Sequence, residues 1–179
     1  MHAPSRPARL ALQLEENAAA WDALLSDVDA GSLVLFGRFE ALARSLGALQ
    51  RLALAPLGIN YAEFTTLGML RTSPPHFRRS PTELRRLVGQ SSAGMTRILR
   101  KLERARLVRR RPAPGDARRR DVVLTPKGGA LAEEAFTALF GAPSDRLALR
   151  SKRQREAWLR ALDELLGFLG PSDGGPDGT

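Results

Sequence analysis

The sequence predicts a mainly α-helical fold that carries one small β-wing. Apolar residues recur at three- and four-residue spacing over most of the 179 residues, which is the pattern of amphipathic helices. Ser-Pro-Thr-Glu from Ser80 and Thr-Pro from Thr125 are strong helix-start signals. Two short β-prone runs, 107–111 and 118–124, predict a hairpin between helices. The segment between them contains the turn-forming residues Pro112, Pro114, Gly115 and Asp116.

Composition excludes several classes of protein. The chain has no cysteine and two histidines, His2 and His76, so we expect neither a disulfide framework nor a metal centre, and no cofactor. A histidine-assisted nucleophile, a phosphate-binding loop and carboxylates clustered beside ligands are also missing, so we do not expect an enzyme. No apolar run approaches the roughly 18 residues of a membrane span, and we expect a cytoplasmic protein without membrane contact.

The N-terminal part predicts an arm followed by three helices. We expect residues 1–13 to form a flexible arm, residues 14–25 a short helix with Trp21 on its apolar face, and residues 32–55 a long helix ending before Pro56. Asn60 and Glu63 then predict a capping box at the start of the third helix. The long helix has a heptad seam that needs a partner helix, made of Leu35, Phe39, Leu42, Leu46 and Leu49.

The segment from Ser80 to Arg104 predicts two helices joined by a tight turn. Ser80, Pro81 and Glu83 form a helix start, and Gly89 and Gln90 provide the turn after about Val88. Ser91 or Ser92 then caps the second helix, which gives a helix-turn-helix. On this helix an apolar face (Met95, Ile98, Leu99, Leu102) lies opposite a basic face (Ala93, Arg97, Arg100, Arg104) that Gly94 and Lys101 flank.

Positive charge is concentrated in this region. Between Arg97 and Arg120 there are eleven Lys or Arg residues against Glu103 and Asp116, a net charge of +9 that equals the net charge of the whole chain. Like charges at helical spacing repel, so an anionic partner best explains the cluster. The hairpin adds Arg118, Arg119 and Arg120 at the tip of the wing, and Arg109 to Arg111 either contact phosphates or stay solvated.

The C-terminal part predicts two further helices. One begins at Thr125-Pro126, and the last spans residues 152–169 with a second heptad seam: Trp158, Leu162, Leu165 and Leu169. We therefore expect dimerisation helices at 14–56 and 129–170, a winged helix-turn-helix DNA-binding lobe at 57–128, and a disordered tail at 171–179.

These motifs resemble the MarR family of bacterial transcriptional regulators. The resemblance rests on S-P-T-E-L from Ser80, G-M-T from Gly94, L-E-x-A-x-L-V from Leu102, and D-x-R from Asp116 followed by L-T-P-x-G from Leu124. It implies a homodimer with interlocked terminal helices, a recognition helix in each major groove and a wing in or near the minor groove. Relatives commonly have glycine at Arg106, so we predict a positive φ there or a different end to the helix.

Together, the residues and the resemblance predict a DNA-binding surface. Arg97 is the expected specificity residue, since arginine pairs with guanine, and the wing arginines suit a narrow minor groove. The predicted set is Ser80, Ser91, Ser92, Gly94, Thr96, Arg97, Arg100, Lys101, Arg104, Arg118, Arg119 and Arg120. The partner would be pseudo-palindromic double-stranded DNA in the nucleoid. The alternative is a sequence-independent architectural or RNA-binding protein, which predicts steep salt dependence and little sequence preference.

The extra N-terminal helix with Trp21, together with Arg38, resembles the urate-responsive branch of the family. That branch has Asp where this chain has Thr65 and Arg where it has Ile98, so two polar anchors are missing. The resemblance therefore implies the location of a pocket for a small-molecule effector, such as an aromatic or phenolic compound, and not urate itself. The predicted ligand-binding residues are Trp21, Arg38, Phe64 and Thr65.

Overall fold

The computed structural model of the protein describes residues 6–25, 27, 29–74, 76–141 and 151–169. The chain forms two compact units, Met1–Glu63 and Phe64–Thr179, and the boundary falls inside a helix. The predicted disordered tail and the first five residues of the predicted arm lie outside the described residues. No helix in the described ranges combines the length and apolar character needed to cross a membrane.

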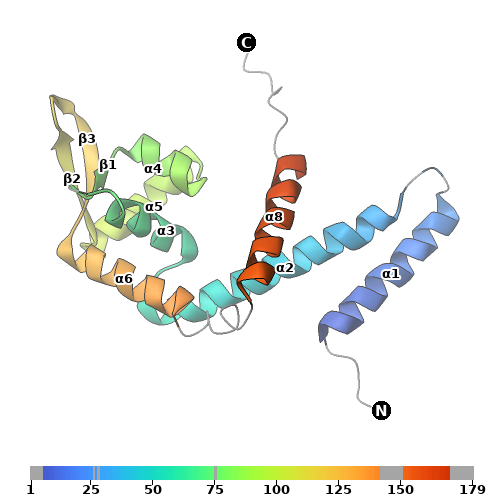
Figure 1. The fold of residues 1–179 in the computed structure, drawn as a ribbon. Helices are drawn as coiled ribbons and strands as arrows, with labels where there is room; N and C mark the ends of the chain where they lie inside the picture. The colour runs from blue at the N-terminus through green and yellow to red at the C-terminus, as the bar shows by residue number, and fades with distance from the viewer. Residues whose placement is uncertain (1–5, 26, 28, 75, 142–150, 170–179) are drawn as a thin grey trace, which may run out of the picture. The chain divides into compact units, whose positions relative to one another are not determined.

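The first unit is a helical hairpin. Helix α1 spans Arg6–Leu24, α2 spans Gly31–Leu54, and a short 3-10 turn, η1, covers Ala55–Leu57 (Figure 1). Helices α1 and α2 run side by side, with Leu14 packed so closely on Gly37 that a Cβ there would lie 2.4 Å from it. The prediction of an arm through residue 13 was wrong from Arg6 onward, because Pro7 lies in the first helical turn, where proline is tolerated.

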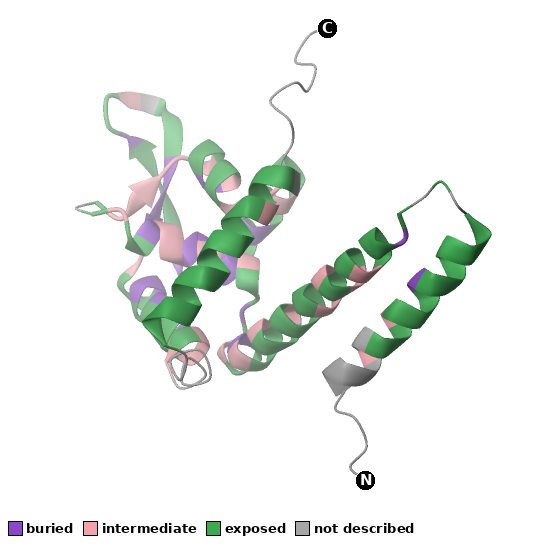
Figure 2. Ribbon diagram, turned by 45° about the vertical axis from the view of Figure 1, so that its right-hand side comes forward, coloured by how far each residue is buried: buried purple, intermediate pink, exposed green. Residues whose placement is uncertain are grey.

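The apolar seam on α2 stays exposed in the described part of the chain. Its leucines remain about half exposed, at 46% for Leu35, 49% for Leu42 and Leu46, and 51% for Leu49 (Figure 2). Phe36 and Leu52, which lie off this seam, are more exposed still. An apolar stripe of this size on a long helix is typical of a surface that packs against another molecule.

The second unit places a small sheet beside a group of helices. Helix α3 (Tyr61–Arg71) leads into β1 (Arg78–Arg79), α4 (Pro81–Val88), α5 (Ser92–Arg104), β2 (Val108–Ala113), β3 (Asp116–Leu124) and α6 (Pro126–Phe140). The strands are antiparallel in the order β1-β3-β2. The core between sheet and helices is made of Leu67, Leu70, Leu84, Leu99, Leu102 and Val122. The fold class is therefore mainly α with a small β-wing, as predicted.

Strand β1 was not predicted from the sequence. It has two residues, and it exists because β3 pairs with it: Arg78 lies opposite Val123 and Arg79 opposite Val122. Phe77 enters the strand with φ of +48°. Its backbone is held in this unusual conformation by the Phe77 N–H donating to Ser73 O at 2.8 Å.

The helix starts follow the predicted caps. Asn60 Oδ1 accepts from the Glu63 N–H at 2.9 Å, and the Glu63 carboxylate accepts from the Asn60 N–H at 3.0 Å. Ser91, and not Ser92, caps α5, and Thr125 caps α6 with Pro126 in its first turn. The last helix, α8, spans Lys152–Leu169 as predicted, and its apolar side chains are exposed: Trp158, Leu159, Leu162, Leu166 and Phe168.

Candidate nucleic-acid interface

Helices α4 and α5 are joined by a tight turn that fixes the start of α5. Helix α4 ends at Gly89, which has φ of +65°, and the Gln90 N–H donates to Arg85 O at 3.0 Å. Ser91 follows in extended conformation, and its Oγ accepts from the Gly94 N–H at 3.1 Å. The first turn of α5 is thus capped by a short hydroxyl side chain and exposed at Ser92 and Ala93.

Helix α5 has sharply separated faces. Met95, Leu99 and Leu102 are 1–2% exposed and attach the helix to the core. The opposite face forms an open hollow lined by Ser92, Ala93, Thr96, Arg97, Arg100, Lys101 and Arg104. Among the described residues, no acidic side chain pairs with the guanidinium groups of Arg97, Arg100 or Arg104. The charges of these three arginines are therefore available for a partner.

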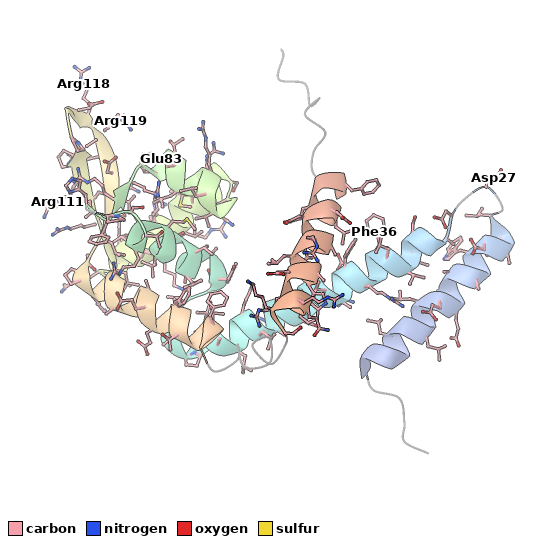
Figure 3. All side chains as sticks on the ribbon, viewed as in Figure 1. Asp27, Phe36, Glu83, Arg111, Arg118 and Arg119 are labelled. Atoms are coloured by element: carbon pink, nitrogen blue, oxygen red, sulfur yellow. The ribbon has the colours of Figure 1, made fainter. Side chains whose placement is uncertain are left out.

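The pairing of β2 with β3 is irregular at the tip of the wing. Arg120 pairs with Pro112 and Asp116 with Ala113, so Ala117, Arg118 and Arg119 have no partner on β2. Asp116 Oδ1 orders this bulge by accepting from the backbone N–H of Arg118 at 2.9 Å and of Arg119 at 3.4 Å. Figure 3 shows Arg118 and Arg119 at the end of the hairpin.

The three arginines predicted at the tip are not equivalent. Arg118 and Arg119 lie in the bulge, whereas Arg120 lies in the ladder below it. Next to the tip, Arg110 turns back toward α5 and its Nε donates to Glu103 Oε1 at 2.8 Å. This contact links the wing to the recognition helix, so Arg110 differs from Arg109 and Arg111, which the sequence analysis treated alike.

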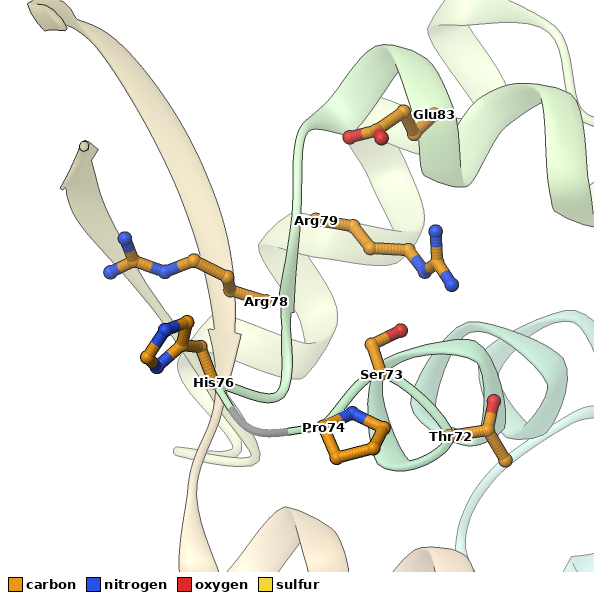
Figure 4. A pocket seen from close by; sticks show the side chains of 7 residues that line it. All are labelled: Thr72, Ser73, Pro74, His76, Arg78, Arg79 and Glu83. Atoms are coloured by element: carbon orange, nitrogen blue, oxygen red, sulfur yellow. The ribbon is translucent and has the colours of Figure 1, made fainter. Parts of the chain in front are cut away.

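Ser80 lies at the N-terminus of α4, where its side chain is engaged in the capping box. Its backbone N–H and its Oγ both donate to Glu83 Oε2, at 2.8 and 2.7 Å, and its Oγ accepts from the Glu83 N–H at 3.2 Å. Glu83 lines a hollow with Arg79 and Ser73 (Figure 4). The hydrogen bonds from Ser80, aided by the charges of Arg79 and Arg119, hold the pKa of Glu83 below its ordinary value of 4.5.

The lowered pKa of Glu83 predicts a loss of stability in acid. Because the pKa is lower in the folded than in the unfolded chain, the contribution of Glu83 is complete above about pH 4.5 and is lost as the pH falls through the lowered pKa. We expect Glu83→Gln to unfold more easily than the unmodified protein at pH 7, with the difference shrinking toward pH 3. Denaturant unfolding across this range measures it. Glu134→Gln, on the exposed side of α6, is the control, and an equal pH dependence in both variants would contradict the assignment.

Arg106 follows the C-terminal end of α5 and lies in the left-handed region, with φ of +59°, as predicted from the glycine common in relatives. Its backbone is held there because the Arg106 N–H donates to Glu103 O at 2.9 Å and Arg106 O accepts from Thr125 Oγ1 at 2.9 Å. A side chain with a Cβ carries strain in this conformation.

Replacing Arg106 by glycine should therefore stabilise the protein. We expect Arg106→Gly to raise the free energy of unfolding by about 0.5–1 kcal/mol. This value is the backbone strain that glycine releases, minus the additional conformational entropy that glycine loses on folding. Denaturant titration measures the change. Arg106→Ala removes the same charge but keeps the Cβ, so a gain in both variants would show that charge, and not backbone strain, is responsible.

The predicted ligand-binding residues fall in both units. Trp21 is 51% exposed and lines a small apolar hollow with Leu25 and Leu33. Arg38 is paired with Glu15 at 3.0 Å within the first unit. In the second unit Phe64 is buried and Thr65 partly buried. A shared pocket for these four residues stays a prediction.

Sequence analysis missed one group of candidate residues, those of β1. Arg78 and Arg79 stand immediately before the capping box, and a pair of arginines at that position was a signal for further basic surface. Within the described residues no group of three His, Asp or Glu side chains could hold a metal ion.

A capped helix with an exposed basic face, preceded by a tight turn and followed by a basic hairpin, defines the winged helix-turn-helix class. The family model that matches residues 57–119 is that of the MarR family. A transcriptional repressor of the helix-turn-helix type from Mycobacterium tuberculosis is 35% identical over 113 residues, which make up 63% of this chain and 79% of the relative. The protein belongs to the MarR family.

Solved structures with the same fold include complexes with DNA. The repressor CouR bound to a 23-mer DNA duplex matches with a TM-score of 0.64 and 26% identity, over 73% of this chain and 91% of CouR. A MarR variant from E. coli complexed with operator DNA matches with a TM-score of 0.63 and 25% identity, over 75% of this chain and 96% of that chain. Both agree with a winged-helix fold for this chain.

Proposed function

We propose that this protein is a dimeric transcriptional repressor that recognises pseudo-palindromic duplex DNA. The observation that carries the proposal is the exposed face of α5, where three arginines have no acidic partner among the described residues and surround small hydroxyl and methyl side chains: Ser92, Ala93 and Thr96. Arginine can read guanine through two hydrogen bonds, and short side chains allow close approach to base edges. Relatives that carry the name of repressor, and the solved DNA complexes, support this reading.

The dimer is supported by exposed apolar surface on two helices, α2 and α8. Half-exposed leucines run along α2, and α8 carries exposed Trp158, Leu162 and Phe168. We propose that residues 14–56 and 129–170 form the interface between two copies. A two-fold dimer presents two recognition helices, so the half-sites should lie about 10 base pairs apart, one helical turn of DNA.

We further propose that a small molecule, such as an aromatic or phenolic compound, changes the spacing of the two recognition helices and releases the DNA. The candidate contacts are Trp21, Arg38, Phe64 and Thr65. An effector of this kind must bind the DNA-binding conformation of the dimer and the released conformation with different affinity. The Arg38–Glu15 pair and the exposed Trp21 offer polar and aromatic groups to such a compound.

A competition assay tests the function. The full-length protein is incubated at physiological salt with a DNA fragment recovered by selection and with an excess of random duplex. We expect the selected fragment to be retained, since specific binding is typically at least about 10³-fold tighter than nonspecific binding. Equal displacement by random DNA would overturn the proposal in favour of a sequence-independent nucleic-acid-binding protein.

A further inference from the structure

The β-sheet has two faces with different side chains, because successive residues on a strand alternate and directly opposed residues share a face. Arg79 and Arg110 both lie opposite Val122. This is the face turned to the helices: Arg79 Nε donates to Met69 O at 3.2 Å and Arg110 Nε donates to Glu103 at 2.8 Å. These two arginines are therefore used within the lobe.

The neighbouring arginines point the other way. Arg78 and Arg109 both lie opposite Val123, and Arg111 lies opposite Asp121. We call these five residues the outer sheet face. Figure 4 shows the side chain of Arg78 on the opposite side of β1 from Arg79, and Figure 3 shows Arg111 on the side of the wing away from the helices.

The outer sheet face carries positive charge without internal partners. Within the described residues, no ion pair engages Arg78, Arg109 or Arg111, and the Nε atom of Arg78 is buried without a hydrogen-bond partner. Val123 and Asp121, which lie opposite these arginines in the strand register, are each 8% exposed. Three arginines share this face with a single carboxylate, that of Asp121, and one of them has a buried donor without a partner, which together indicate a surface that is completed by an anion.

We infer that the outer sheet face binds DNA backbone phosphates that lie beyond the wing, outside the operator half-site. This rests on the proposed function. If α5 lies in the major groove and the bulge of Arg118 and Arg119 lies at the next minor groove, the outer sheet face is directed toward the DNA on the far side of the wing from α5. Arg109 and Arg111 leave their strand about 7 Å apart, so each can neutralise a separate phosphate. The surface extends the footprint without reading sequence.

The test compares two duplexes that contain the same selected site. The short duplex holds only the two half-sites, and the long duplex adds one helical turn of mixed sequence at each end. Each phosphate contact contributes about 0.9 to the slope of log affinity against log salt. We expect the triple variant Arg78→Gln/Arg109→Gln/Arg111→Gln to reduce the magnitude of this slope on the long duplex by about 2–3 for each protomer. On the short duplex the slope should not change.

Single substitutions along β2 give a matched control. Arg109→Gln and Arg111→Gln should each weaken binding to the long duplex, whereas Arg110→Gln removes the same charge from the opposite face and should not distinguish the two duplexes. Equal losses on both duplexes, or no loss on either, would overturn the inference. Failure of the proposed function would look different, because the unmodified protein would then fail to prefer the selected site over random DNA.

Discussion

Arg97→Ala is expected to abolish much of the discrimination between operator and random DNA. Arg97 lies near the start of α5, exposed and without an acidic partner among the described residues, where its guanidinium can reach a guanine edge. A bidentate arginine-guanine contact contributes about 1–3 kcal/mol of discrimination, and a dimer makes the contact twice. We expect the selected site to bind roughly 10- to 100-fold less tightly per half-site while random DNA loses little.

Lys101→Ala is the comparison for Arg97→Ala. Lys101 lies four residues further along the same basic face. If Lys101 contacts a phosphate, its loss weakens binding to all sequences alike and lowers the slope of log affinity against log salt by about 1. Parallel titrations of both variants with selected and random duplexes measure the difference. If the two variants lost affinity by the same factor on both duplexes, the division between a reading residue and a phosphate-contacting residue would be wrong.

Gly128→Ala should strongly destabilise the DNA-binding lobe. Gly128 is buried in the first turn of α6, and a Cβ there would lie 2.0 Å from the main-chain oxygen of Leu107. That oxygen already accepts from the Thr125 N–H at 3.1 Å and lies 2.9 Å from Thr125 Oγ1, so moving it away would disrupt the start of α6. Overpacking against main chain costs about 2 kcal/mol or more. We expect the melting temperature to fall by roughly 4–8 °C.

The adjacent glycine is a matched control. A Cβ on Gly129 would meet Leu124 at 3.8 Å and Arg71 at 3.9 Å, which are ordinary contacts. Since alanine favours helix more than glycine, Gly129→Ala should be neutral or stabilising by up to about 1 kcal/mol. Thermal unfolding of both variants measures the effect. Similar melting temperatures for the two would show that α6 does not pack on Leu107 as closely as the structure indicates.

Much of the DNA-binding lobe could be predicted because its signals are local. A capping box needs residues three apart, and the faces of α5 follow from helical periodicity alone, so Ser80, Thr125 and the buried Met95 were all placed correctly. The positive φ of Arg106 followed from the glycine found at that position in relatives. These features depend on interactions within a few residues of chain.

The rest depended on contacts between distant residues. Strand β1 has too few residues to show a period and forms only against β3. The two faces of the sheet, which separate Arg110 from Arg109 and Arg111, follow from the strand register, and the pairing irregularity at Pro112 sets the position of the tip. Helix α1 extends into the predicted arm because Pro7 stands in its first turn, where a helix tolerates proline.

The central claim is that two copies of this chain read duplex DNA through the exposed face of α5. The most direct measurement is a selection of random duplexes by the full-length protein at physiological salt, followed by sequencing of the bound fraction. The account predicts enrichment of a pseudo-palindrome whose half-sites lie about 10 base pairs apart, and loss of this enrichment in Arg97→Ala. A bound fraction with no common sequence, or a single half-site without two-fold symmetry, would contradict it.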